Sequence, residues 1–182
     1  MIKQILGNEQ VTQYYVVSLI GKTLVLLIAP INTIVISYLT KRKERLTRSQ
    51  FGKAVLAGGG LSLVFFVACQ IGTPLFVWLF YRNLYESVKG IVTVVNLAQI
   101  LGLFSAFLFI LVLTFTDERW QLWIQLAHFC ILLVSSVLAA RTYGMMGFAV
   151  ASLGANSLRV AAVVILGIVK AGKDKGDRNA DR

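Results

Sequence analysis

Acidic residues are scarce in this chain of 182 residues, which has 8 aspartates and glutamates against 18 lysines and arginines. All of them lie outside the long apolar runs, at Glu9, Glu44, Glu86, Asp117, Glu118, Asp174, Asp177 and Asp181. Ionisable residues within a membrane usually mark the path of an ion or a substrate. Because the apolar runs contain no carboxylate, they have no acidic group that could couple transport to protons or sodium, or bind a cationic drug.

Cysteine and histidine are also rare, with two cysteines and one histidine. Cys69 and Cys130 lie far apart without Cys-x-x-Cys spacing, so we expect neither a disulfide nor a metal site. The sequence has no glycine-rich phosphate loop and no Ser-His-Asp set, and we predict that the chain is not an enzyme and uses no cofactor. His128 fits either a hydrogen-bonded packing residue or a titrating group.

Long apolar runs dominate the rest of the chain, and the mean hydropathy is +0.76. Each run exceeds the roughly 20 residues that a helix needs to cross a hydrocarbon core. The runs cover residues 14–39, 54–80, 91–115, 120–140 and 144–169. The sequence therefore predicts an all-α, polytopic membrane helical bundle with about five transmembrane helices. They form one lobe, residues 1–170, followed by a disordered cytoplasmic tail, residues 171–182.

The net charge of +10 fits membrane topology better than nucleic-acid binding. With five spans, twelve basic residues fall on one side, in Lys41–Lys53, at Arg119 and in Lys170–Arg182. The other side has four, at Lys3, Arg82, Lys89 and Arg141. Because basic connections stay in the cytoplasm, we expect the N-terminus outside and the C-terminus in the cytoplasm. The expected environment is a lipid bilayer, with no nucleic-acid partner.

Two prolines lie inside the first two runs. Pro30 and Pro74 each remove a helical hydrogen bond, which favours kinks. Such kinks fit hinges for alternating access and also a static bundle. The basic segment Thr40–Lys53 fits either a stretch held on anionic lipid or a solvated loop.

Polar side chains recur at helical spacing within the apolar runs. They include Asn96, Gln99, Gln125, His128, Asn156 and Arg159. In lipid, such faces must meet other protein or water, so they fit hydrogen bonds between helices or the lining of a polar cavity.

Two basic residues, Arg159 and Lys22, lie within the apolar runs. A charge at the centre of a membrane costs about 2.5–3.5 kcal/mol on insertion scales, and such residues usually face a polar interior. An interior with basic groups alone suits an anionic substrate. Arginine is well adapted to this role because its planar fork can bind a phosphate through two hydrogen bonds.

Three segments resemble helices of a known family. Residues 27–39, which contain LIAPINT and SYL before a basic segment, resemble one helix of the polysaccharide flippases. The segment TPLFVWLFY at residues 73–81, followed by Tyr85, is similar to the end of the next helix, and YGMMGFAVA at residues 143–151 resembles the start of a final or penultimate helix. Over residues 14–170 the chain resembles the C-terminal part of the Wzx-type lipid-linked oligosaccharide flippases, whose superfamily includes the MATE multidrug proteins.

The resemblance implies a flippase lobe in the bacterial cytoplasmic (inner) membrane. Its spans would be equivalent to helices eight to twelve of a twelve-helix family member, and its partner would be a missing N-terminal lobe. Its implied substrate is an anionic lipid-linked glycan. The candidate substrate-binding residues are Arg159, Lys22, Asn156, Gln99, Asn96 and Gln125. The alternatives are a partner-dependent small membrane subunit of a multi-component transporter, and a nonfunctional truncated remnant.

Overall fold

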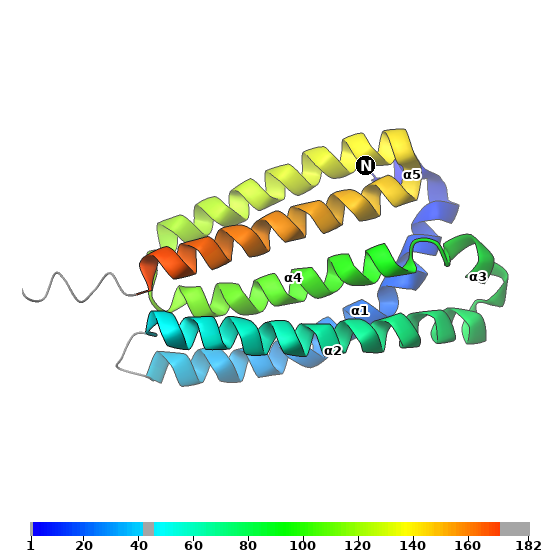
Figure 1. Cartoon of the computed structure of the whole chain (residues 1–182). Coiled ribbons are helices and arrows are strands. Elements are labelled where there is room, and N and C mark those ends of the chain that lie inside the picture. The colour runs from blue at the N-terminus through cyan, green and yellow to red at the C-terminus, as the bar shows by residue number, and fades with distance from the viewer. Residues whose placement is uncertain (1, 42–45, 172–182) are drawn as a thin grey trace, which may run out of the picture.

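The computed structural model describes residues 2–41 and 46–171, and these form helices and turns without a strand. The elements are α1 (Ile2–Lys41), α2 (Arg48–Phe80), α3 (Arg82–Val88), α4 (Val92–Leu113) and α5 (Glu118–Lys170). The long helices lie side by side as an elongated bundle (Figure 1). The predicted all-helical class is confirmed.

Helix α5 reverses its direction at Gly144, which has φ 60° and ψ −140°. Figure 1 shows its two arms, residues 118–143 and residues 145–170, running back alongside each other. Lys170 Nζ accordingly lies 5.8 Å from the ring centre of Trp120, at the start of the first arm. The turn is tight, because a side chain at Gly147 would collide with the carbonyl of Ala139. The boundary that the sequence predicts near residues 140–144 falls at this reversal.

Within residues 2–41 and 46–171, four helices are long and apolar enough, by length and composition, to cross a membrane. They cover Ile5–Ser37, Arg48–Phe80, Val92–Leu113 and Arg119–Lys170. Large apolar side chains point outward from these helices, as shown by Leu56 at 78% and Leu122 at 68% exposure. An apolar exterior is what a lipid environment requires, and a soluble monomer rarely exposes so much apolar surface.

Helix α4 is the centre of the bundle and packs against α1, α2 and α5. It buries residues along its whole length, from Val92 to Val112, and contains no ionisable side chain. Near one end of the bundle, Val95 packs with Val17 and Val77. Near the other end, Leu108 packs with Phe51 and Val163. These two apolar clusters hold the neighbouring helices against α4 at both ends of the bundle.

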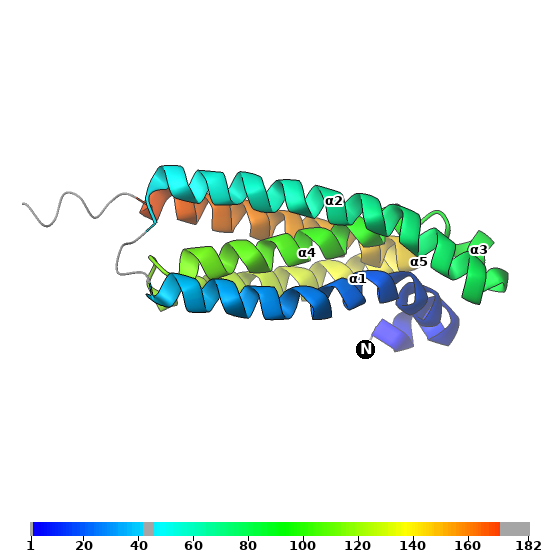
Figure 2. The same ribbon diagram turned by 90° about the horizontal axis from the view of Figure 1, so that it is seen from below.

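The backbone break seen in the described residues of the first two helices does not coincide with a proline. Helix α1 is interrupted at Gly7, which has φ 77° and ψ 169°, and remains helical through Pro30. Helix α2 likewise continues through Pro74. Figure 2 shows the N-terminal segment of α1 turned away from the long part of the helix. The sequence places the first span at residues 14–39, whereas the helix itself begins at Ile2.

Helix α2 begins with a capping box. The Thr47 hydroxyl accepts from the backbone N–H of Gln50, and the Gln50 side chain accepts from the backbone N–H of Thr47. Phe51, one turn inside, is fully buried against Phe115 with ring centres 5.7 Å apart. Within the basic segment, residues 48–53 thus form the anchored start of α2, and residues 40–41 form the end of α1. Residues 42–45, and residues 172–182 of the predicted tail, lie outside the described residues.

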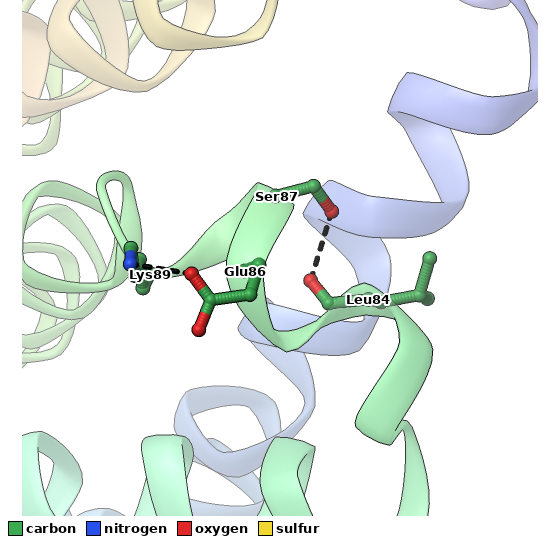
Figure 3. Close-up of polar contacts among 4 residues, drawn as sticks. All are labelled: Leu84, Glu86, Ser87 and Lys89. Atoms are coloured by element: carbon green, nitrogen blue, oxygen red, sulfur yellow. Dashed lines mark hydrogen bonds and ion pairs between the residues drawn. The ribbon is translucent and has the colours of Figure 1, made fainter.

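The short helix α3 forms part of the connection between α2 and α4. The Ser87 hydroxyl donates to the carbonyl of Leu84 over 2.8 Å, and the ammonium of Lys89 pairs with the carboxylate of Glu86 (Figure 3). The hydrogen bond to Glu86, with the negative charge of Glu86, raises the pKa of Lys89. In the sequence this segment is a connection between two apolar runs, and its helix is seen in the structure alone.

Candidate functional site

Arg159 lies in the second arm of α5, between the reversal and the C-terminal end of the helix. Its side chain is half-buried, and its guanidinium carbon lies 5.7 Å from the ring centre of Phe109 on α4. The Nε atom is buried without a hydrogen-bond partner. A cation over an aromatic face gains electrostatic stabilisation, but that contact does not satisfy an N–H donor. Arg159 therefore retains an unused donor.

Asn156, one turn before Arg159, connects three helical segments. Its Nδ2 donates to the carbonyl of Ala98 on α4 over 2.8 Å. Its Oδ1 lies 3.2 Å from Nε2 of His128 on the first arm of α5. Because the contact with Ala98 fixes the orientation of the amide, Oδ1 is the atom that faces the histidine. An amide oxygen only accepts, so His128 must carry a proton on Nε2.

Asn96 holds α4 against α2 and is fully buried. Its Nδ2 donates to the carbonyl of Cys69 over 3.1 Å and to Oε1 of Gln70 over 3.0 Å. Its Oδ1 accepts from the hydroxyl of Thr73 over 3.2 Å. Gln70 in turn donates to Thr93 of α4 over 2.8 Å. These four bonds bridge the two helices next to Pro74 and hold that part of α2 in place.

Gln99 plays the same part between α4 and α1. Its Nε2 donates to the carbonyl of Ser18 over 3.3 Å, and its side chain fills the space that a side chain at Gly21 would need. Gln125, on the first arm of α5, is half-buried, and the structure shows no side-chain hydrogen bond for it among the described residues. The amides at 96, 99 and 156 thus bond neighbouring helices, which is one of the two roles their spacing predicts.

Together these bonds form a polar layer across the bundle, made of Ser18, Cys69, Gln70, Thr73, Asn96, Gln99, His128 and Asn156. The layer relates the depths of Lys22 and Arg159. Along the bundle axis, Ser18 lies at the height of Gln99, and Asn156 lies at the height of Ala98. Helix α1 and the second arm of α5 run toward the same end of the bundle (Figure 1). Lys22 and Arg159 each follow the layer by about one helical turn. The two cations therefore share one depth in the bundle.

The structure does not bring Lys22 to Arg159 within the bundle. Lys22 is exposed on α1, and its ammonium lies 4.2 Å from the ring centre of Tyr15 on the same helix. Tyr15 is itself 53% exposed. The ammonium of Lys22 and the ring that it contacts therefore both lie on the exposed surface of α1.

A separate cavity of about 80 Å³ lies between α1, α2 and α4. Its walls are apolar, with Phe65 and Phe104 among them, and its polar groups are Asn32 and Ser62. Asn32 Oδ1 is buried without a hydrogen-bond partner. None of the six candidate substrate-binding residues lines this space. Asn32 is absent from that set because its only signal is one amide within an apolar run.

Comparison with protein-family models, with curated proteins and with solved structures finds no match for the chain. Its function is therefore inferred from the arrangement of its own residues. Sequence reasoning also missed Phe109 and the carbonyl of Ala98, which position Arg159 and Asn156. Neither carries a signal in sequence, since a phenylalanine and a backbone carbonyl occur throughout an apolar helix.

Proposed function

We propose that the chain is the C-terminal lobe of a flippase of the polysaccharide or O-antigen type. In this proposal it belongs to the bacterial cytoplasmic membrane and moves a lipid-linked oligosaccharide across it. The supporting observation is Arg159, a half-buried cation with an unused buried donor. Its neighbours α4 and the second arm of α5 contain no carboxylate.

The physical argument concerns the cost of that charge. A cation inside a membrane is costly and usually pairs with an anion of the protein. The described residues show no ion pair at Arg159, so the compensating anion is proposed to come from the substrate. A diphosphate fits best, since the planar guanidinium can donate two parallel hydrogen bonds to its oxygens.

The proposed topology has five passes, with the N-terminus outside and the C-terminus in the cytoplasm. It treats the two arms of α5 as separate passes, because a straight helix of 53 residues would extend about 80 Å, far beyond a hydrocarbon core. The end of α1, the start of α2, the α4–α5 connection and the end of α5 lie at one end of the bundle (Figure 1). Lys41, Arg48, Arg119 and Lys170 belong to these segments, which supports placing that end in the cytoplasm.

Lys22 supports the proposal that a second lobe covers α1. An exposed ammonium in the middle of an apolar helix would face lipid in the isolated chain, at a cost of a few kcal/mol. A facing lobe would enclose Lys22 at the depth of Arg159 and add it to the anion site. In this arrangement the amides of the polar layer set the helix positions, and the two cations bind substrate.

The direct test is binding of farnesyl diphosphate to the purified chain in detergent. We expect wild-type chain to bind it and Arg159→Gln to weaken binding about ten- to hundredfold, the loss of one charge-assisted contact. The matched control is Arg141→Gln, which removes an exposed arginine from the first arm of the same helix. Equal affinity of wild-type chain and Arg159→Gln would overturn the assigned role of Arg159.

The main alternative is a small membrane subunit that works only with a partner, and the exposed Lys22 favours it as well. Purification in mild detergent from its native membrane separates the two proposals. Recovery in a stable complex with a soluble ATPase would support the subunit. Recovery with a second set of apolar helices, or alone with diphosphate binding intact, would support the flippase lobe.

A further inference from the structure

We propose that His128 is a second binding group of the Arg159 site and takes up one proton on Nδ1 when a dianion binds. This inference rests on the anion site proposed above and adds a proton to it. The site would then bind its anion and a proton together.

Asn156 fixes which ring nitrogen of His128 carries the proton. Its amide donates to Ala98 over 2.8 Å and presents Oδ1 to Nε2 of His128 at 3.2 Å. The neutral ring is therefore held as the tautomer with its proton on Nε2. Nδ1 has no hydrogen-bond partner among the described residues and keeps its lone pair available. Because Nε2 already carries a proton, Nδ1 is the ring nitrogen that can take up another. The ring is half-buried, so Nδ1 can receive that proton from solvent.

Arg159 determines when His128 takes up this proton. It follows Asn156 by about one helical turn on the same arm, so its positive charge lies near the ring that Asn156 contacts, and like charges oppose each other. The empty site therefore favours a neutral His128. When a dianion binds, one of its negative charges pairs with the guanidinium of Arg159. The other negative charge stabilises the protonated, positively charged ring of His128. The proton comes from solvent and forms an N–H bond at Nδ1, and no bond to the ligand is made or broken.

Other ionisable groups do not offer an alternative explanation. Helix α4, which packs against both arms of α5, contains none. The second arm contains Arg159 and, at its end, Lys170, which lies over Trp120. The first arm has Glu118, Arg119 and Arg141 near its ends, and Cys130 and Tyr143 are exposed. On α1, Tyr14 packs on Phe148, and Tyr15 and Lys22 lie together at the surface.

The chemistry selects the ligand class. A monoanion is satisfied by Arg159 alone and brings no proton. A tetrahedral dianion, or a diphosphate with two negative charges, matches a guanidinium and an imidazolium on one site. If the anion and the proton bind together, they would also move together. A pH gradient across the membrane would then drive the anion in the same direction as the protons.

The experiment uses sulfate, a dianion that does not itself titrate between pH 6 and 8. His128 is the one histidine in the chain, so protein labelled with ¹⁵N-histidine, with any purification tag removed, reports this residue alone. We expect the Nε2–H tautomer at pH 7.5 without sulfate and a doubly protonated ring with saturating sulfate. Sulfate affinity should fall by up to about tenfold per pH unit, the limit for one linked proton.

The matched variant is His128→Gln, whose amide nitrogen can still donate to Asn156 but cannot take a proton. It should bind sulfate with an affinity independent of pH, and its thermal unfolding should match that of wild type. Sulfate binding by wild type that is independent of pH and lost in Arg159→Gln would overturn the role of His128 and leave the anion site standing. Failure of wild type to bind either sulfate or farnesyl diphosphate would overturn both proposals.

Discussion

Asn96 donates a hydrogen bond of 3.1 Å to the backbone carbonyl of Cys69 from a fully buried position. The two residues lie on different helices, and the bond is made one turn before Pro74. Proline leaves helical carbonyls in the preceding turn without their usual donors or with weakened geometry. Pro74 removes the backbone donor for the carbonyl of Gln70, and the bond from Asn96 to the carbonyl of Cys69 does not replace it. Together with its bond to the Gln70 side chain, this bond holds the turn before Pro74 against α4.

Replacement of Asn96 by alanine should therefore destabilise the bundle. Polar bonds between membrane helices average about 0.6 kcal/mol, and Asn96 makes three, so we expect a loss of about 1–2 kcal/mol. The loss can be measured by reversible unfolding in mixed detergent micelles. Asn83→Ala is the control, because Asn83 is exposed on α3. Equal stability of the two variants would show that the α2–α4 bridge contributes nothing.

Gly144→Ala should weaken the reversal of α5. The backbone at this position has φ 60° and ψ −140°, a conformation that a side chain disfavours by about 1–3 kcal/mol. Gly154→Ala provides the opposite control on the same helix, since nothing lies within 4 Å of the added methyl group. Alanine favours a helix interior by about 0.5–1 kcal/mol over glycine, so this control should stabilise. A neutral Gly144→Ala would contradict the observed turn geometry.

Phe51→Ala should be among the most destabilising single changes in the chain. The ring is fully buried, lies against Phe115 and fills the space beside Gly167. Its removal leaves a cavity, and we expect a loss of about 3 kcal/mol. Phe80→Ala, at a position 66% exposed, should change stability little. If both variants unfold at the same denaturant concentration, Phe51 does not anchor the start of α2.

The ion pair of Glu86 and Lys89 makes a prediction about pH. Glu86 raises the pKa of Lys89, so the folded value lies above that of the unfolded chain, near 10.4 for lysine. The stabilisation is complete below about pH 10.4 and is lost as pH rises through the folded pKa. ¹⁵N NMR of the lysine side chains should show Glu86→Gln lowering the pKa of Lys89. Glu9→Gln should leave it unchanged, and an unchanged value in Glu86→Gln would contradict the pair.

Arg159→Leu should leave the stability of the bundle unchanged or raise it. The guanidinium carries a buried donor without a partner, and an apolar side chain removes that cost. Thermal unfolding in detergent, with Arg141→Leu as the control, measures the effect. A loss of more than about 2 kcal/mol would instead assign Arg159 a structural role, of the size expected when a satisfied buried charge is removed.

The sequence by itself determined that the chain is helical and apolar, and it located the three amides that bond neighbouring helices and the two cations within the apolar runs. Hydropathy is a local property, so the long runs predicted the long helices, including the boundary near Gly144 where two runs meet. The resemblance to flippases and the assignment of the anionic substrate remain predictions. The same holds for the inside and outside ends, which charge counting alone assigns.

Only the tertiary structure decided what each polar residue does. Asn96, Gln99 and Asn156 share one spacing pattern with Arg159, yet the three amides bond neighbouring helices and Arg159 keeps a free donor. Arg159 lies near the centre of its apolar run and Lys22 nearer one end of its run, but the sequence does not show that Lys22 is exposed beside Tyr15 or that Arg159 packs over Phe109 on α4. The physical reason is that a hydrogen-bond partner on another helix depends on the rotation and depth of both helices. Packing against α4 sets these, and the spacing within one helix does not.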